Sequence, residues 1–207
     1  MKVSLHSTST AIAGKLSIRC PHCGHVGTFE PVQSANDIST NEGYTLGIRR
    51  CPNRFCHGHL FFIMKNNAVI ESFPPLRIDF NSDGVPEKVK QTFEEAITCH
   101  ANKCYIASAI MIRRTLEEIC YERGATGDNL KAKIASLKSK VILPQELLEA
   151  ADDLRLLGND AAHIESKEFN EISEKEISIS ILLTKEIIKS LYQYKTLLTE
   201  LKSLKKN

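Results

Sequence analysis

Two pairs of closely spaced cysteines constrain this sequence more than any other feature. The strings CPHCG and CPNRFC each open with Cys-Pro and each carry a second cysteine. Each string brings two thiolates onto one tight turn, and four thiolates are the ligand set of a closed tetrahedral zinc site. The sequence therefore predicts a small β zinc ribbon at the N-terminal end, with one structural zinc as its cofactor. The predicted ligands are Cys20, Cys23, Cys51 and Cys56.

The identity of one zinc ligand stays open at this point. Four residues separate Cys51 from Cys56, where two are commoner, and three histidines lie close enough along the chain to replace a cysteine: His25, His57 and His59. Four cysteine ligands leave no open coordination position, so the zinc is expected to be structural and not catalytic. An alternative to this purely structural role is that the ribbon also binds nucleic acid. The basic residues for that contact are Arg49, Arg50, Arg54 and Lys65.

The absence of targeting signals in the sequence predicts that the protein stays in a reducing compartment. No stretch approaches the roughly 18 apolar residues of a membrane span, and the start lacks the apolar core of a secretory signal, so we expect a cytoplasmic protein without a membrane partner. In the cytoplasm, paired cysteines indicate metal before disulfides. The other cysteines, Cys99, Cys104 and Cys120, fall within helical patterns and are expected to be buried, inert thiols. A net charge of only +2 excludes a strong overall electrostatic attraction of the protein to nucleic acid.

A proline-containing segment divides two compositional regimes. Short β-favouring runs, such as those at 26–29, 44–49 and 60–64, occupy residues 16–70. The predicted domains are a zinc ribbon over 1–72, a linker over 73–86 and a helical bundle over 87–207. Apolar residues in the last part recur at helical spacing. The expected helices span 87–100, 103–123, 128–140, 144–163 and 173–204.

Short connections between these helices favour antiparallel neighbours. The predicted fold class is therefore mainly α, with a small β zinc ribbon followed by an up-and-down helical bundle. Asp128 is expected to cap the third helix. The last helix carries more apolar stripe than one bundle of this size needs, which predicts that it projects or pairs with a second subunit, as in a homodimer.

A polar stripe on the fourth helix offers two interpretations. Arg155, Asn159 and His163 follow one another at i to i+4 and share one helix face. As catalytic residues they would cleave an RNA phosphodiester without metal: the histidine moves protons and the arginine stabilises charge on the phosphate. In the structural interpretation, Arg155 pairs with Asp152 or with a carboxylate on the second helix, and Asn159 forms hydrogen bonds across the bundle. His163 then caps the helix end, where it interacts favourably with the helix dipole. Gly158 between them permits close approach of a backbone or ligand.

A second polar group lies on the second helix. It contains Arg113, Arg114, Glu117 and Glu118. The i to i+3 spacing of Arg114 and Glu117 permits an ion pair on one face. We expect this pair either to support Arg155 or Asn159 across the bundle or to be an ordinary solvated surface pair.

The helical half resembles a known family. The strings TFEEA, IRRTLEEIC, LKAKIASL and LRLLGNDAAH, within about residues 74–201, are similar to family 4145 of the bacterial domains of unknown function. That family belongs to the HEPN superfamily of helical nucleotide-binding domains. The resemblance implies a HEPN-like bundle of four or five helices that often dimerises. It also implies an association with antiviral defence, restriction and toxin systems, and many members carry a preceding zinc ribbon.

Active HEPN members are metal-independent ribonucleases whose motif is an arginine, a polar residue, three further residues and a histidine. On this chain the polar residue falls on Asn159 and the histidine on His163, while the arginine position falls on Gly158. Arg155, one turn earlier, has a side chain long enough to reach the same phosphate. Two functions follow: a metal-independent endoribonuclease or RNA-binding protein acting as a homodimer, or a non-catalytic adaptor that recognises nucleic acid or a partner protein of a defence system.

Overall fold

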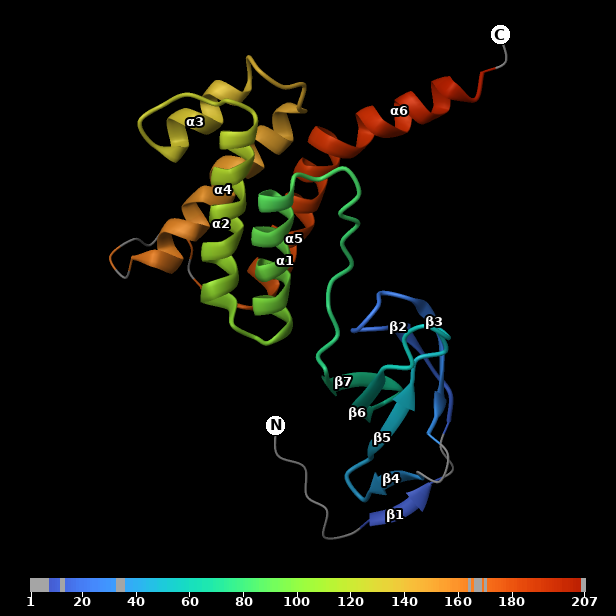
Figure 1. Cartoon of the computed structure of the whole chain (residues 1–207). Coiled ribbons are helices and arrows are strands. Elements are labelled where there is room, and N and C mark those ends of the chain that lie inside the picture. The colour runs from blue at the N-terminus through green and yellow to red at the C-terminus, as the bar shows by residue number, and fades with distance from the viewer. Residues whose placement is uncertain are drawn as a thin grey trace. The chain divides into compact units, whose positions relative to one another are not determined.

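The computed structural model describes residues 8–11, 14–32, 36–163, 165, 169 and 171–205 (Figure 1). The chain divides into two compact units, Met1–Asp79 and Phe80–Asn207. We name them the sheet unit and the helical unit. The division lies inside the segment 73–86, where repeated prolines and the sequence NSDG interrupt regular structure.

The sheet unit is one antiparallel sheet of seven strands. The strand β5 is central, because it pairs with β3 and β4 along one side and with β6 along the other. Beyond these, β2 pairs with β3, β1 with β4, and β7 with β6. The strands are β1 (Thr8–Ala11), β2 (Leu16–Arg19), β3 (Val26–Pro31), β4 (Asp37–Thr40), β5 (Tyr44–Arg50), β6 (His59–Lys65) and β7 (Ala68–Phe73).

The prediction of a mainly α fold is wrong. Helices account for 48% of the described residues and strands for 20%, and the strands form a full N-terminal sheet and not a small β appendage. The β-favouring runs of the sequence became β3, β5 and β6. The strands β1 and β4 escaped notice because they are four residues long and rich in Ser and Thr, without an alternating apolar pattern. These two strands form because they pair with neighbours in the sheet, and the local β-propensity of a sequence does not reveal such pairing.

A buried ion pair lies at the middle of the sheet unit. Arg49 of β5 donates two hydrogen bonds to Asp37 of β4, with Nη1–Oδ1 and Nη2–Oδ2 distances of 2.8 and 2.6 Å. The two residues are only 2% and 3% exposed. The guanidinium also lies over the ring of Phe62, 4.7 Å from its centroid. A Cβ on the neighbouring Gly47 would lie 2.1 Å from Asp37 Oδ1, so this position needs a glycine.

The helical unit contains the helices that the apolar spacing predicts, except at the chain's end. The central helix is α2, which contacts α1, α3, α4 and α5. No helix within the described part of the chain is both long and apolar enough to cross a bilayer. The elements are α1 (Glu87–Ala101), α2 (Tyr105–Glu122), α3 (Leu130–Leu137), α4 (Gln145–Ala162), α5 (Glu174–Ile188), the π-helical segment η1 (Lys189–Gln193) and α6 (Tyr194–Ser203).

Specific residues mark the starts of these helices. Pro86 and Pro144 precede α1 and α4, where a missing N–H costs nothing. Asn129, and not the predicted Asp128, caps α3: its side-chain oxygen accepts from the amide of Ala132 at 3.0 Å. The start of α5 carries a capping box formed by Ser173 and the glutamate three residues later.

The single last helix predicted over 173–204 is interrupted. The segment η1 has a wider turn that takes up one extra residue, so the apolar stripe of α5 is not continued in register into α6. Tyr192 of η1 is buried, and the guanidinium of Arg123 lies 4.2 Å from its ring centroid. Arg123 Nη2 also donates to the carbonyl of Leu191 at 2.5 Å. These contacts hold η1 against the end of α2.

The core of the helical unit is apolar. The ring of Phe80 packs edge-on against Phe93 of α1, with centroids 4.7 Å apart, and Gln193 Nε2 donates to the carbonyl of Asn81 at 2.7 Å. Residues 80–83 thus belong to the helical unit and close one side of its core. The largest fully buried side chains there are Phe93, Ile97, Ile112, Ile119, Leu157, Ile177, Ile181, Ile187 and Ile188.

Candidate functional site

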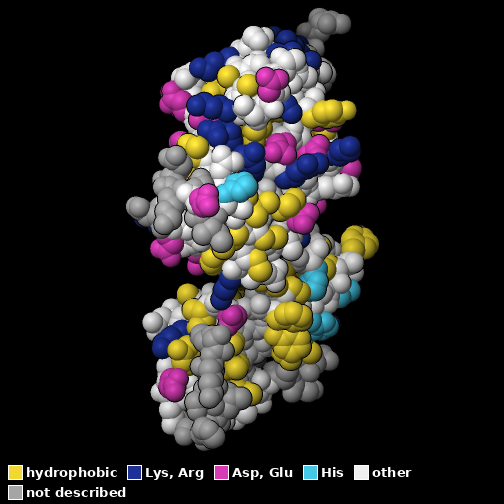
Figure 2. All heavy atoms as spheres, turned by 90° about the vertical axis from the view of Figure 1, so that its left-hand side faces the viewer, with side chains coloured by type: hydrophobic (Ala, Val, Ile, Leu, Met, Phe, Trp, Pro, Cys, Tyr) yellow, Lys and Arg dark blue, Asp and Glu magenta, His cyan; other side chains and the backbone are white. Residues whose placement is uncertain are grey.

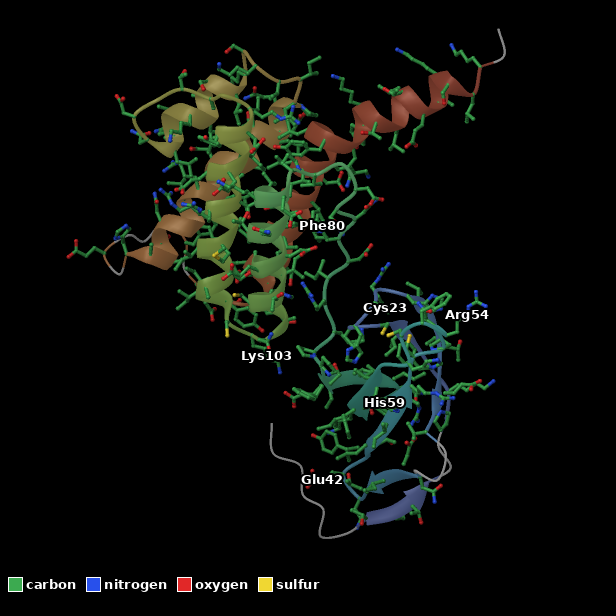
Figure 3. All side chains as sticks on the ribbon, viewed as in Figure 1. Cys23, Glu42, Arg54, His59, Phe80 and Lys103 are labelled. Carbon is green, nitrogen blue, oxygen red and sulfur yellow. The ribbon has the colours of Figure 1, made fainter. Side chains whose placement is uncertain are left out.

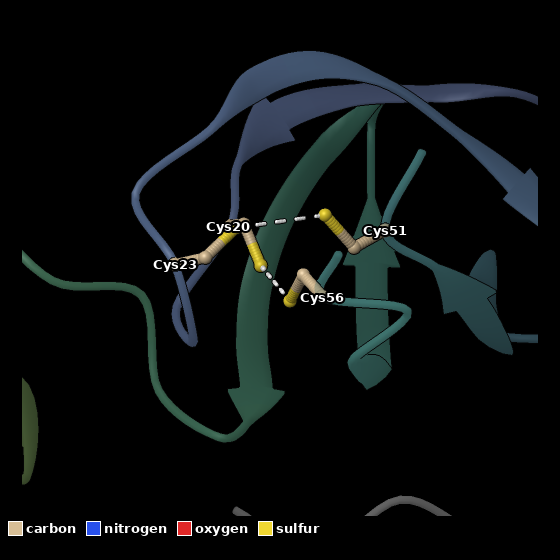
Figure 4. Close-up of side chains that lie close together, drawn as sticks. All are labelled: Cys20, Cys23, Cys51 and Cys56. Atoms are coloured by element: carbon tan, nitrogen blue, oxygen red, sulfur yellow. Dashed lines mark hydrogen bonds between the residues drawn. The ribbon is translucent and has the colours of Figure 1, made fainter. Parts of the chain in front are cut away.

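Four sulfur atoms meet between two loops of the sheet unit (Figures 3 and 4). Cys20 and Cys23 come from the loop between β2 and β3, and Cys51 and Cys56 from the loop between β5 and β6. All four Sγ atoms lie within 4.8 Å of one another, and none forms a disulfide. The Sγ–Sγ distance is 3.9 Å for Cys20–Cys56 and 3.8 Å for Cys23–Cys51. We call this group the thiol cluster.

Both loops are closed by backbone hydrogen bonds that begin at their first cysteine. The amide of Cys20 donates to the carbonyl of His25 at 2.8 Å, and the amide of Cys51 donates to that of Gly58 at 2.9 Å. In the first loop Gly24 has a φ of +72°, a left-handed conformation that glycine adopts without strain. The Cys-Pro opening and the glycine after the second cysteine thus have a structural role in turning the chain.

The second loop accommodates its two additional residues through Asn53. The carbonyl of Asn53 accepts from the amide of Cys56 at 2.9 Å, and its side-chain oxygen accepts from the amide of Phe55 at 3.0 Å. Its side-chain nitrogen donates to Cys23 Sγ of the other loop at 3.7 Å. This extra turn explains why a spacing of four residues still delivers Cys56 to the cluster.

The geometry of the thiol cluster fits a tetrahedral metal. Zinc–sulfur bonds of about 2.3 Å at tetrahedral angles place the sulfurs about 3.8 Å apart, close to the distances observed here, whereas a disulfide requires about 2.05 Å. Burial raises the pKa of Cys51 to about 12, while the backbone amide of His25 lowers the pKa of Cys23 to about 7. A bound cation stabilises all four thiolates and removes this mismatch, since a coordinating thiol loses its proton.

Histidine does not join the cluster in the described part of the chain. The metal-ligating side chains that lie together are the four cysteines, so His25, His57 and His59 are not needed as substitutes. His57 has a φ of +48° and serves the turn after Cys56. The carbonyl of His59 is hydrogen-bonded to Nε2 of His22 at 2.9 Å, which ties the two loops together beside the thiols.

Two of the three side chains in the polar stripe of α4 form hydrogen bonds within the helical unit. Arg155 is 9% exposed and its Nε donates to Asp152 Oδ1 at 2.6 Å. Asn159 Oδ1 accepts from Arg113 of α2, also at 2.6 Å. His163 is exposed at the end of α4, where its amide donates to the carbonyl of Asn159 at 2.9 Å. The stripe therefore follows the structural interpretation for the first two residues and leaves the histidine at the surface.

Gly158 is explained by the same arginine from α2. A Cβ at Gly158 would lie 2.5 Å from Cβ of Arg113, so the glycine lets the arginine stem cross α4. From there Arg113 Nη1 reaches Asn159 and the carbonyl of Arg155, the latter at 3.4 Å. Sequence reasoning missed this contact, because nothing in the local pattern shows which arginine of α2 faces a glycine on α4.

Comparison with protein families identifies the helical part. Residues 94–207, more than half of the chain, match the family described as Domain of unknown function (DUF4145). The chain belongs to this family. The matched DUF4145 region begins within α1 and contains the whole polar stripe. No curated protein matches the chain, and no solved structure does.

The predicted supporting residues of the DUF4145 region form a small network on α2. Arg114 Nη1 lies 3.7 Å from Glu117, and its Nη2 lies 2.8 Å from the nearly buried Glu118. Glu117 also lies 3.5 Å from Nε of Arg113. Arg114 and Glu117 thus reach the stripe of α4 only indirectly, through Arg113.

The remaining cysteines differ in how deeply they are buried, and so do the basic residues predicted to contact nucleic acid. Cys120 is buried as expected, and burial raises its pKa to about 11, but Cys104 is exposed and that expectation is wrong. Arg49 is buried with Asp37 and is not free to contact nucleic acid. Arg54 lies over the ring of Phe55, and Lys65 over that of Tyr44.

An apolar groove on the sheet unit escaped sequence analysis. It encloses about 540 Å³ on one face of β4, β5, β6 and β7, and Figure 2 shows hydrophobic side chains gathered at the surface of this unit. Its side chains stand in two cross-strand rows, set by the pairing of Leu46 with Ile63 and of Ile48 with Phe61. Phe61 and Phe73 remain 52% and 72% exposed. The apolar lining consists of Ile38, Leu46, Ile48, Phe61, Ile63 and Phe73.

Proposed function

We propose that this chain is a zinc-stabilised recognition protein whose sheet unit binds an apolar segment of another protein. The apolar groove carries this proposal. Large aromatic and aliphatic side chains at a rigid, concave surface are the usual anchors of protein–protein contacts. Contiguous exposed apolar surface of this kind is uncommon unless it is an interaction site.

Zinc is the metal that the thiol cluster suits best. Four soft thiolates at tetrahedral separation select zinc among the common cellular metals, and a four-cysteine site is closed to substrate. The cluster thus supports a structural zinc-ribbon role. It fixes the loop that leads into β3 and the loop that follows β5, and these two strands pair with each other. The recognition surface on the same sheet depends on that rigidity.

The polar stripe favours recognition over catalysis. The guanidinium of Arg155 is occupied by Asp152, and the amide oxygen of Asn159 is occupied by Arg113. The Arg113–Asn159 bond holds α2 against α4, Arg155 is paired within α4, and neither group is poised at a phosphate. We propose, on the resemblance of the helical unit to HEPN domains, that the protein acts in a prokaryotic defence or toxin system as an adaptor that forms a homodimer through the helical unit.

Photo-crosslinking tests the groove as a partner site. We expect benzoylphenylalanine placed at Phe61 or Phe73 to give one discrete adduct with a second protein in cells that produce both. Phe55 is the matched control, since it is a phenylalanine of the same unit, 83% exposed and outside the groove. Adducts from all three positions, or none from Phe61 and Phe73, would contradict the proposal.

A second candidate function rests on the exposed His163. A surface histidine one turn beyond Asn159 is able to take the proton of an RNA 2′-hydroxyl, and two copies in a homodimer would supply two such groups. The products would be a 2′,3′-cyclic phosphate and a free 5′-hydroxyl, because the attacking oxygen belongs to the RNA itself. This reading makes the protein a metal-independent endoribonuclease.

Cleavage of total cellular RNA in the presence of chelator separates the two functions. The enzyme reading requires cleavage that His163→Ala reduces by about 10²–10⁴-fold, the usual contribution of general acid–base assistance. Asp153→Ala, on an exposed position of the same helix, is the matched control and should cleave as the parent does. Absence of cleavage by the purified homodimer leaves recognition as the function.

A further inference from the structure

The helix α6 presents an apolar stripe that its own unit leaves uncovered. None of its residues is buried. Leu197, Leu201 and Leu204 are 55%, 62% and 79% exposed, and Figure 1 shows α6 leaving the other helices of its unit. By contrast, α5 buries Ile177, Ile181 and others against the core. The end of the chain thus changes from a core helix to an unpartnered one across η1.

The stripe has the spacing of a coiled-coil seam. Tyr194, Leu197, Leu201 and Leu204 are separated by three, four and three residues, which is the alternation of a and d positions in a heptad. Leu198, which is 56% exposed, borders this seam on one side. Threonines and lysines occupy the outer positions. The pattern is that of a helix that packs lengthwise on one other helix.

We propose that α6 pairs with α6 of a second copy of this chain as a short parallel coiled coil. This inference rests on the homodimer proposed above and specifies the surface, the orientation and the register. The stripe then lies on the two-fold axis, with Leu197 facing Leu197 and Leu201 facing Leu201 of the other copy. Such an interface is self-complementary and closes at two copies.

Charge fixes the orientation. Glu200 occupies a g position, and Lys205, five residues later, the following e position. In a parallel pair, g of one helix faces this e of the other, so Glu200 meets Lys205 twice with opposite charge. An antiparallel pair brings like positions together, glutamate to glutamate and lysine to lysine. The amide of Lys205 still donates to Lys202, at 3.2 Å, so the turn persists beyond α6.

The folded unit makes so short a seam feasible. A helix of ten residues is marginal alone, because nucleation is costly. Here α6 grows out of α5 and η1, and η1 is fixed to α2 through Tyr192 and Arg123. Nucleation is therefore complete before pairing, and only the seam contacts need to form.

Cysteine cross-linking tests the register. In a Cys104→Ser background of the full chain, Tyr194→Cys and Leu204→Cys place thiols at the two ends of the stripe. A parallel pair gives disulfide-linked dimers of each variant alone and no enrichment of mixed dimers when the two are combined. Cross-links that form only between Tyr194→Cys and Leu204→Cys chains would overturn the parallel arrangement.

Sedimentation of the full chain tests the surface. Leu201→Lys should raise the dimer dissociation constant at least about tenfold, as expected for a central interface anchor. The matched control Thr199→Lys, on the outer side of α6, should leave it unchanged, and Glu200→Lys should weaken pairing until Lys205→Glu is added. A monomeric parent overturns both the homodimer and the pairing. A homodimer that tolerates Leu201→Lys overturns only the α6 pairing.

Discussion

The sheet unit and the helical unit are stabilised by different kinds of interaction. In the sheet unit the buried apolar side chains other than cysteine are Phe29, Leu60 and Phe62, within the described residues, and they share the interior with two cysteines and the Arg49–Asp37 pair. The helical unit buries a continuous set of isoleucines, leucines and alanines from five helices. The sheet unit is thus held by a few directed bonds, and the helical unit by many undirected contacts.

The difference teaches where each unit is vulnerable. The sheet unit buries too little apolar surface to be robust alone, so we expect a metal bound at the thiol cluster to contribute a large share of its folding free energy. Directed bonds fail when one partner is removed, because the other partner stays buried and unsatisfied. An apolar core loses only the contacts that are deleted. The same kind of substitution should therefore have unequal effects in the two units.

Loss of one thiol should have the largest effect. We expect Cys51→Ser to unfold the sheet unit, since structural zinc sites contribute about 10–16 kcal/mol to the folding of small domains. Cys120→Ser is the control, because Cys120 is equally buried but lies in the helical unit. Two-dimensional NMR of the full chain should show loss of dispersed sheet resonances for the first variant only. Intact sheet resonances in Cys51→Ser would refute the metal's role.

Breaking the buried ion pair should have the next largest effect. Arg49→Met leaves the carboxylate of Asp37 buried without a partner and should cost about 3–5 kcal/mol in unfolding free energy of the sheet unit. Adding Asp37→Leu should recover much of this loss, because the unpaired charge is then gone. Urea unfolding at saturating zinc measures both. Equal stability of Arg49→Met and the parent would show that the pair is not needed.

A methylene deletion in the helical core should cost less. Ile181 is fully buried in α5, and Ile181→Val should lower the unfolding free energy of the helical unit by about 0.5–1.5 kcal/mol. The sheet unit should unfold at an unchanged urea concentration. A loss above about 3 kcal/mol would mean that this core is as brittle as the sheet unit.

The smallest effect concerns pH. The hydrogen bond from Arg155 holds the pKa of the Asp152 carboxyl below its ordinary value of 3.8. A depressed carboxyl pKa stabilises the fold above that ordinary value, and the contribution fades as pH falls through it toward the lower folded pKa. The melting temperature of Asp152→Asn should therefore lie slightly below that of the parent at neutral pH and approach it in acid. A difference independent of pH would refute the pairing.

Sequence reasoning succeeded where a signal was local or strongly periodic. The spacing of Cys20, Cys23, Cys51 and Cys56 predicted the thiol cluster, and apolar periodicity predicted the helices from α1 to α5. It failed where structure depends on distant partners. The strands β1 and β4 are defined by pairing, the contact of Arg113 with Gly158 by helix packing, and the apolar groove by strand register.

Hydrogen exchange with and without bound zinc tests the central contrast most directly. The full chain should contain about one zinc per molecule. Chelation should abolish amide protection in β2, β3 and β5 and at the loop amides of Cys20 and Cys51, while α1, α2 and α4 keep theirs. Returning zinc should restore protection in the strands. Sheet protection that survives complete removal of zinc, or helical protection that is lost with it, would contradict the account.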